Sequence, residues 1–376
     1  MYQDPKGFDA RLHLIEGAQR ERGEVLGLAR IEAAKRAFTT RRITFQASMR
    51  LLRAARPAAG DLVLARIETL GQHQKLESPH GRRAQLYEGD EIIVAFGERY
   101  APDQFEAVVP ADLGPCDLVA GGGVAGAVLS RHARMKRATR IQPIGLIADA
   151  LGRPVNLAGH ALPDRPLSGQ FRRGQRPQVI AVAGTSMNAG KTTTAAGLIH
   201  GMARAGLKVA ATKVTGTGSG GDVWSMVDAG ACRVLDFTDM GHASTAGLPL
   251  DRIERTALSL IAHCAGEAPD AIVVEIADGV LQRETAHLLS CEAFRAAIDG
   301  VLFAAGDALG AVGGREWLLA HGHRVIGVSG LVSASPLAAR EASRAMGEAV
   351  LTLSQLRDPV AAPQICFAAD PAIALA

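Results

Sequence analysis

Short apolar runs recur along the second half of the chain, and stretches with helix-like spacing of apolar residues lie between them. The runs are residues 179–182, 209–212, 271–276, 300–303 and 325–328. Apolar runs of this length between helical stretches are typical of parallel strands that helices cover on both faces. The pattern predicts a doubly wound, mostly parallel α/β sheet within residues 178–376.

The first half of the chain has a different pattern. Residues 61–67, 91–96 and 105–109 are strand-like, and a hairpin is indicated where 144–148 and 154–158 flank a turn that contains glycine. These runs predict a smaller, mostly β domain over residues 45–165. Residues 8–42 contain no proline and are rich in Arg, Glu, Ala and Leu, so residues 1–44 are predicted to form a helical N-terminal segment.

A polar, proline-containing segment separates the two halves, and we predict a linker at residues 166–177. The charge also changes here. Residues 1–176 contain 27 Lys and Arg against 19 Asp and Glu, whereas residues 177–376 contain 14 against 19. This asymmetry supports two domains.

The overall composition is that of a globular α/β protein, since 48% of the 376 residues are hydrophobic and 21% are charged. No run approaches the roughly 20 apolar residues of a membrane helix, so we expect a cytoplasmic protein with no membrane segment. The five cysteines have no C-x-x-C spacing, which argues against a zinc knuckle or a disulfide framework.

One glycine cluster in the first half has the spacing of a dinucleotide-binding loop. Residues 121–126 read G-G-G-V-A-G and follow a short apolar run. No complete βαβ unit surrounds them, and Pro143 falls in the strand that would follow, so we favour a structural glycine loop.

A phosphate-binding motif follows the first apolar run of the second half. It reads G-T-x-x-x-x-G-K-T and leads into a helical stretch, which is the strand–loop–helix context of a triphosphate-binding loop. Its N–H groups and the helix N-terminus can surround phosphate oxygens. The predicted nucleotide-binding residues are Gly184, Thr185, Ser186, Met187, Asn188, Ala189, Gly190, Lys191, Thr192 and Thr193.

Three charged residues are candidates for catalysis. Lys191 is expected to neutralise the β and γ phosphates, and the Thr192 hydroxyl is expected to bind Mg²⁺. Lys213 ends the second apolar run, and such folds bind ligands at the carboxyl ends of their parallel strands. Glu275 ends a further strand-like run and fits a Mg²⁺ ion that keeps most of its waters. The predicted catalytic residues are therefore Lys191, Lys213 and Glu275, and the predicted cofactor ion is Mg²⁺.

Over residues 178–335 these motifs resemble the dethiobiotin-synthetase-like branch of P-loop proteins, which includes the cobyrinic acid amidases and the molybdopterin-guanine dinucleotide accessory protein. Besides the loop, Lys213 matches a lysine that ends a strand in this branch, and Asp222 opens a segment similar to one in the accessory protein. The resemblance implies that Lys213 faces the transferred phosphate or an anionic substrate, that Asp222 helps Thr192 and Glu275 to hold Mg²⁺, and that the chain forms a homodimer.

Two features leave alternatives open. From the residues alone, Asp222 could instead cap the helix that it opens. Residues 275–279 read E-I-A-D-G, where the family has E-G-A-G-G, which puts the substrate pocket in doubt. The polar residues Asp278, Gln282, Arg283 and Glu284 could form a different acceptor site or decorate the next helix.

The function that these features favour is ATP- and Mg²⁺-dependent phosphorylation or activation of a small metabolite, with GTP as the other nucleotide to consider. One alternative is a nucleotide-switch accessory protein that acts on a protein partner. Another is an ATPase that acts with nucleic acid. The sequence disfavours nucleic acid, because the arginines of the first half are not interleaved with aromatic residues that could stack on bases.

Overall fold

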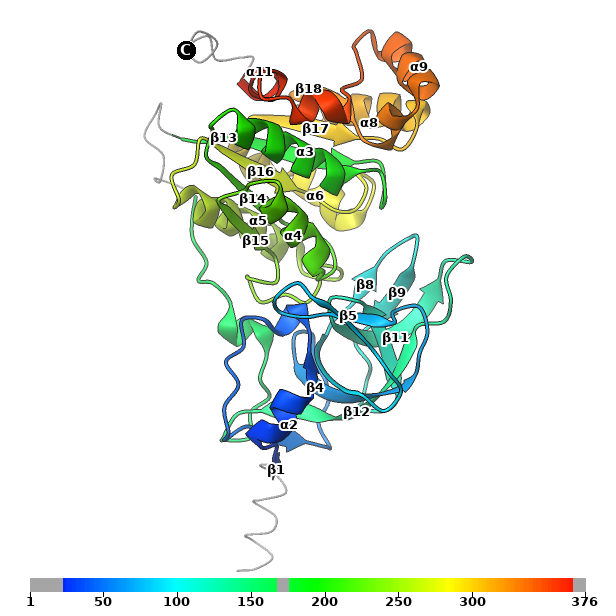
Figure 1. Cartoon of the computed structure of the whole chain (residues 1–376), viewed down its shortest axis with the longest axis vertical. Coiled ribbons are helices and arrows are strands. Elements are labelled where there is room, and N and C mark those ends of the chain that lie inside the picture. Colours follow the sequence, from blue (N-terminus) through cyan, green and yellow to red (C-terminus); the bar gives the residue numbers. More distant parts are fainter. Residues whose placement is uncertain (1–22, 168–175, 368–376) are drawn as a thin grey trace, which may run out of the picture. The chain divides into compact units, whose positions relative to one another are not determined.

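The computed structural model describes residues 23–167 and 176–367, and the chain divides into two compact units (Figure 1). The described part of the first unit runs to Arg99 and continues through Gln104–Ala161 and Gly241–Ala243. The second unit contains the remaining described residues. The centre of the predicted linker, residues 168–175, lies outside the described residues.

The first unit is built on a ten-stranded sheet that closes into a barrel. Strand β4 pairs with β7, β7 with β11, β11 with β10, β10 with β12, and β12 again with β4. A closed ring leaves no exposed edge among these five strands. Their bounds are Leu62–Thr69 (β4), Glu91–Phe96 (β7), Cys116–Ala120 (β10), Val124–Arg131 (β11) and Thr139–Ala148 (β12).

Shorter strands extend or flank the barrel. Strands β1, β3, β8 and β9 continue the sheet, β2 pairs with β7, and β5 and β6 form a separate hairpin. Their bounds are Glu24–Val25 (β1), Lys35–Arg36 (β2), Arg50–Leu52 (β3), Lys75–Glu77 (β5), Arg83–Gln85 (β6), Arg99–Tyr100 (β8) and Phe105–Val108 (β9), and the short helix Leu28–Ala33 is α2.

Alternating side chains of the barrel strands enter two different cores. Leu62 and Leu64 of β4 belong to one apolar cluster, whereas Val63 and Ala65 belong to the other, and all four are fully buried. Full burial of each larger apolar side chain contributes about 1.5–3 kcal/mol. The period of two explains why both faces of this strand read as apolar in the sequence.

Two expectations for the first half differ from the structure. Over residues 23–44 the structure shows one short helix and strands that pair with β3 and β7, rather than a helical segment; residues 1–22 lie outside the described residues. The predicted hairpin is present only as an antiparallel bridge of Ala148 with Pro154, and residues 157 and 158 begin a 3₁₀ turn rather than continue a strand. The strands expected at 61–67, 91–96 and 105–109 are present as β4, β7 and β9.

The glycine cluster at 121–126 is a structural loop, as favoured from the sequence. Gly121–Gly123 form the turn between the antiparallel strands β10 and β11, and no helix follows them. Gly123 has a φ of 98°, and a Cβ atom there would lie 2.0 Å from the Cβ of Ala37. The turn therefore requires glycine both for its backbone conformation and for close packing.

We expect Gly123→Ala to destabilise the protein by about 2–4 kcal/mol, because the left-handed conformation and the steric clash each cost about 1–2 kcal/mol. Gly89→Ala is the matched control. Gly89 has a φ of 89°, but a Cβ atom there would have no neighbour within 4 Å. Chemical denaturation of both variants separates the two costs, and equal losses would show that the contact with Ala37 contributes nothing.

The second unit confirms the predicted doubly wound α/β sheet. Six parallel strands lie in the order β15-β14-β16-β13-β17-β18. The strands are Gln178–Gly184 (β13), Val209–Lys213 (β14), Arg233–Asp236 (β15), Ala271–Glu275 (β16), Gly300–Ala304 (β17) and Val325–Ser329 (β18). Five of them coincide with the apolar runs, and only the edge strand β15 was not predicted.

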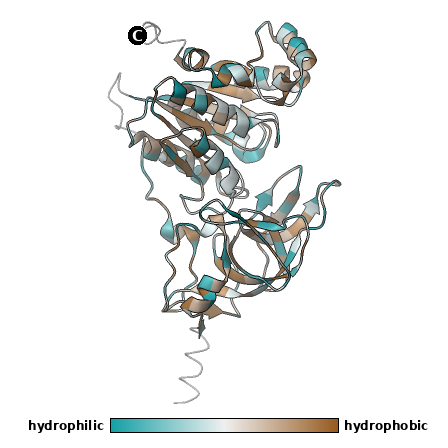
Figure 2. Ribbon diagram, in the orientation of Figure 1, coloured by the Kyte–Doolittle hydropathy of each residue, from teal (hydrophilic) through white to brown (hydrophobic). Residues whose placement is uncertain are grey.

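Helices cover both faces of this sheet. Alternate residues of β13 enter two apolar clusters, with Ile180 and Val182 in one and Val179 and Ala181 in the other. Figure 2 colours the strands of this sheet mostly as hydrophobic. The helices are Lys191–Arg204 (α3), Gly220–Asp228 (α4), Leu250–Ala265 (α5), Arg283–Ser290 (α6), Glu292–Ala297 (α7), Ala308–Ala320 (α8), Pro336–Met346 (α9), Leu353–Arg357 (α10) and Ala361–Phe367 (α11).

The strand order creates one switch point. From β13 the chain runs outward on one side to β14 and β15, and it later crosses from β16 to β17 on the other side of β13. Loops at the carboxyl ends of the strands diverge at such a point, which is where open α/β sheets bind ligands. The phosphate-binding motif follows β13 directly.

Among the described residues, no helix is long and apolar enough to cross a membrane.

Candidate nucleotide-binding site

The phosphate loop has the strand–loop–helix form that the sequence predicts. Gly184 ends β13, residues 185–190 form the loop, and Lys191 begins α3. A Cβ atom on Gly184 would lie 2.8 Å from both the Ala304 carbonyl oxygen and Cγ of Lys191. Gly190 has a φ of 98° and a Cβ there would approach Gly330 to 3.1 Å. Glycine at both ends thus lets the loop pack closely against its neighbours.

The middle of the loop is held by backbone contacts. The Thr185 N–H donates to the Ala304 carbonyl at 3.0 Å, and the Ala189 carbonyl accepts from Leu331 N–H at 3.0 Å. Ser186 Oγ donates to the Met187 carbonyl at 3.0 Å, and Asn188 is in the left-handed region with a φ of 65°. Outside the loop, Thr193 is exposed on α3, and no hydrogen bond between described residues joins it to the other site residues.

The Lys191 side chain bends back over the loop. Its Nζ donates to the Ser186 carbonyl at 2.6 Å, and the residue is only 6% exposed. Burial lowers the pKa of Lys191, while the carboxylates of Glu275, Asp278 and Asp222 oppose this shift. A largely desolvated ammonium group inside a phosphate loop gains strongly from an anionic partner.

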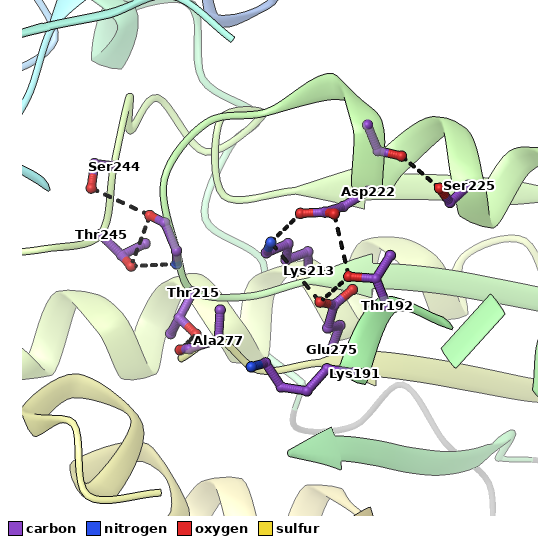
Figure 3. A network of polar contacts seen from close by, with 12 residues as sticks. Lys191, Thr192, Lys213, Thr215, Asp222, Ser225, Ser244, Thr245, Glu275 and Ala277 are labelled. Atoms are coloured by element: carbon purple, nitrogen blue, oxygen red, sulfur yellow. Dashed lines mark hydrogen bonds and ion pairs between the residues drawn. The ribbon is translucent and has the colours of Figure 1, made fainter. Parts of the chain in front are cut away.

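Two carboxylates converge on the hydroxyl of Thr192. Thr192 Oγ1 lies 2.8 Å from Glu275 Oε1 and 3.3 Å from Asp222 Oδ1 (Figure 3). A hydroxyl has one hydrogen to donate, so it cannot satisfy both carboxylates fully. Glu275 Oε2 is also buried and has no hydrogen-bond partner among the described residues. A positively charged group beside these oxygen atoms is therefore stabilised.

Lys213 supplies part of that charge. It ends β14 directly beside Glu275 in the parallel register, and its Nζ forms an ion pair with Asp222 Oδ2 and lies 4.0 Å from Glu275 Oε1. Burial works to lower the pKa of Lys213, but the charges of Asp222 and Glu275 outweigh it and raise the pKa. Conversely, burial works to raise the pKa of Asp222, and the charge of Lys213 holds it below its usual value. Burial raises the pKa of Glu275.

These residues fit a bound Mg²⁺ ion. The ion prefers oxygen ligands, usually takes one or two carboxylates and keeps several waters. Thr192 Oγ1, the unpartnered Oε2 of Glu275 and the carboxylate of Asp222 provide such ligands on one side of the phosphate loop. The described residues contain no group of three or more His, Cys, Asp and Glu side chains suited to a metal, so the remaining ligands would be waters and phosphate oxygens.

A second cluster of hydroxyls was not predicted from the sequence. Thr245 Oγ1 accepts from Gly216 N–H at 2.8 Å, and Thr245 N–H donates to the Gly216 carbonyl at 2.9 Å. Thr215 Oγ1 and Thr285 Oγ1 both donate to the Ala277 carbonyl. These bonds connect the loops after β14, β15 and β16 (Figure 3). Single hydroxyl-to-backbone contacts have no sequence signature, so sequence reasoning could not find them.

Two of the polar residues after β16, Gln282 and Glu284, form hydrogen bonds that hold the local backbone. Gln282 caps α6 by accepting from Thr285 N–H at 2.9 Å. Glu284 is 5% exposed and accepts from Gly247 N–H at 3.0 Å and from Gln282 Nε2. A small pocket lies beside them, and its lining includes Gly216, Thr217, Thr245, Ala277, Asp278 and Gln282.

Comparisons with known proteins find only distant structural similarity. No family model matches, and no curated protein matches significantly. The signal recognition particle receptor FtsY from Elizabethkingia anophelis is 18% identical with a TM-score of 0.30, over 41% of this chain and 49% of that chain. The cell division protein FtsY from Thermotoga maritima is 17% identical with a TM-score of 0.35, over 51% and 69%. The signal recognition particle 54 kDa protein from Aeropyrum pernix K1, in complex with GDP, is 18% identical with a TM-score of 0.35, over 57% and 51%.

Identities and TM-scores this low assign the chain to none of these families, and the match covers about half the length of the first of them. The loop sequence and its strand–loop–helix geometry make the second unit a P-loop nucleotide-binding domain. Beyond this P-loop domain, the resemblance to the dethiobiotin-synthetase-like branch stays a prediction.

Proposed function

We propose that this chain is a Mg²⁺-dependent nucleoside triphosphatase in which the bound nucleotide controls the position of helix α4. One observation supports both parts of the proposal. The Thr192 hydroxyl of the phosphate loop contacts Glu275, at the end of β16, and also Asp222, in the first turn of α4. The Mg²⁺ side of the phosphate site is thereby linked directly to a helix that follows a glycine-rich loop.

The chain's own residues can position a triphosphate and stabilise its reaction. The loop N–H groups and the N-terminus of α3 would surround the β phosphate, and Lys191 would leave the Ser186 carbonyl for phosphate oxygens. Thr192 and Glu275 would hold Mg²⁺, which offsets the negative charge that spreads over the transferred phosphoryl group. Such catalysis needs positioning and charge rather than a covalent nucleophile.

The contacts of Asp222 suggest how α4 would respond. Asp222 is held by Lys213 and approached by Thr192, and the preceding segment contains Gly216, Gly218, Gly220 and Gly221. A Mg²⁺ ion on Thr192 would attract the Asp222 carboxylate and compete with Lys213 for it. Glycines allow the segment to change conformation at low cost, so α4 can follow the change in ligand.

The experiment combines hydrolysis with hydrogen exchange. Phosphate release is measured with Mg²⁺ and either ATP or GTP, and amide exchange of residues 214–222 is compared between a non-hydrolysable triphosphate analogue and the diphosphate. We expect slow Mg²⁺-dependent hydrolysis and a difference in exchange between the two states. Asp222→Asn should remove at least half of that difference, whereas Asp228→Asn, an exposed residue of the same helix, should leave it unchanged. Identical exchange in both states would contradict the switch.

A second candidate is the reaction favoured from the sequence, phosphorylation or activation of a small metabolite. The pocket beside Asp278 and Gln282 supports it, because Gly279 lies against the Thr185 and Ser186 backbone of the phosphate loop. A small acceptor bound there would be near the terminal phosphate. This candidate predicts that one metabolite stimulates phosphate release at least tenfold, which a screen of hydroxyl, amine and carboxylate compounds would reveal.

A homodimer remains a proposal that sedimentation of the full chain can test.

A further inference from the structure

A hairpin and a loop of the first unit bring together a set of basic side chains. The loop joins β11 to β12, and with the adjoining strand ends it spans residues 131–140, which contain five Lys and Arg and no Asp or Glu. The β5–β6 hairpin and its lead-in, residues 72–83, contain three Lys and Arg and one Asp or Glu. Gln72 N–H donates to the Arg137 carbonyl at 2.8 Å, and Thr139 Oγ1 donates to the His73 carbonyl at 2.6 Å. The start of the β5–β6 segment therefore lies against the β11–β12 loop.

Most of these cations lack an acidic partner. Within the described ranges, the ion pairs on these two segments are those of Arg83 with Glu77 at 3.1 Å and Arg140 with Asp117 at 3.4 Å. Six others are exposed and form no ion pair with a described residue; we call them the basic hairpin face. They are Lys75, Arg82, Arg131, Arg134, Lys136 and Arg137.

We propose that the basic hairpin face binds the phosphate backbone of a nucleic acid. Six exposed cations on an adjoining hairpin and loop match a polymer with regularly spaced negative charges. Phosphate contacts by Lys and Arg supply most of non-specific nucleic-acid affinity. Residues 72–83 and 131–140 contain no Phe, Tyr or Trp, so the two segments offer no such ring for stacking bases. Binding is therefore governed by charge and is independent of base sequence.

The composition of the loop favours nucleic acid over a lipid surface. Membrane-binding segments combine basic residues with Trp, Phe or Leu that enter the bilayer. Residues 131–140 contain none of these, and Met135 is only half-exposed, with its carbonyl accepting from Arg131 Nη1 at 2.5 Å. A lipid surface and an acidic protein are the competing partners that the experiment must separate.

The full chain is tested by fluorescence anisotropy with labelled duplex and single-stranded oligonucleotides of unrelated sequences, from 50 to 200 mM salt. We expect sequence-independent binding whose log affinity falls with log salt at a slope of about −5 for the duplex, as six phosphate contacts require. Replacing Arg134, Lys136 and Arg137 together by alanine should make that slope shallower by about 3 and weaken binding at least tenfold at 100 mM salt.

Two comparisons keep the test independent of folding and of the nucleotide site. Arg324, Arg340 and Arg344 are exposed residues of the second unit, and their triple alanine variant removes the same charge without touching the face. Nucleotide hydrolysis should be unchanged in the Arg134, Lys136 and Arg137 variant. A failure of the nucleic-acid proposal can therefore be distinguished from a failure of the proposed triphosphatase activity. An unchanged salt slope in that variant would overturn the proposal. Binding to phosphatidylserine vesicles or polyglutamate, but not to oligonucleotides, would replace it with a lipid or acidic-protein partner.

Discussion

Lys191→Ala is expected to weaken binding of Mg²⁺ with ATP or GTP about 100-fold and to abolish measurable hydrolysis. Lys191 is buried in the phosphate loop, and its Nζ donates to the Ser186 carbonyl, which phosphate oxygens can replace. Loss of one partner from a buried charged interaction costs about 2–5 kcal/mol, and each 1.4 kcal/mol is a tenfold change in affinity. Titration with fluorescent nucleotide analogues and phosphate release measure the two effects.

Two further variants of Lys residues make this result interpretable. The methylene groups of Lys191 lie close to Gly184, so Lys191→Met retains the packing and removes only the charge. Lys208 is exposed just before β14, at the amino end of that strand, whereas the phosphate loop follows the carboxyl end of β13. Lys208→Ala should therefore behave as the wild type. Affinity within threefold of the wild type in both Lys191 variants would show that the loop does not bind the triphosphate through this residue.

Glu275→Gln should raise the Mg²⁺ concentration for half-maximal hydrolysis at least tenfold and lower the maximal rate about 100-fold. Glutamine keeps an oxygen that can accept from Thr192, but it removes the charge and the second carboxylate oxygen that Mg²⁺ prefers. Lys213 keeps its ion pair with Asp222 in this variant, so the local structure should persist. The rate is measured against Mg²⁺ at saturating nucleotide.

The exposed residue Glu316 on α8 provides the matched control, because Glu316→Gln removes the same charge from a side chain that forms no hydrogen bond or ion pair with a described residue. We expect its Mg²⁺ dependence to equal that of the wild type. If Glu275→Gln also leaves the Mg²⁺ dependence unchanged, the metal is held by Thr192 and Asp222 without Glu275. A Thr192→Val variant would then be the next measurement.

The sequence alone determined the elements that depend on local patterns. The apolar runs predict five of the six parallel strands because a strand buried on both faces must be apolar at consecutive positions. The edge strand β15 was missed because Arg233 and Asp236 interrupt its pattern, and an edge strand needs less burial. The phosphate loop was recognisable because its chemistry depends on residues that are contiguous in the chain.

The tertiary structure decided which distant residues meet. The parallel register places Lys213 beside Glu275, and the path of α4 brings Asp222 to both Lys213 and Thr192. The sequence left open whether Asp222 caps a helix or joins the metal side, and the structure shows its side chain in the ion pair with Lys213. Pairing across 62 residues, as between Lys213 and Glu275, has no local signal.

The same distinction applies to the first unit. Glycine-bounded apolar runs predict strands there, but closure into a barrel depends on the pairing of β12 with both β4 and β10. The basic residues at 72–83 and 131–140 are visible in the sequence, yet only the contacts of Gln72 and His73 with the β11–β12 loop and the start of β12 bring them together. Local patterns determine elements because they reflect the burial of each residue, whereas sites depend on contacts between segments whose separation along the chain does not reveal their distance in space.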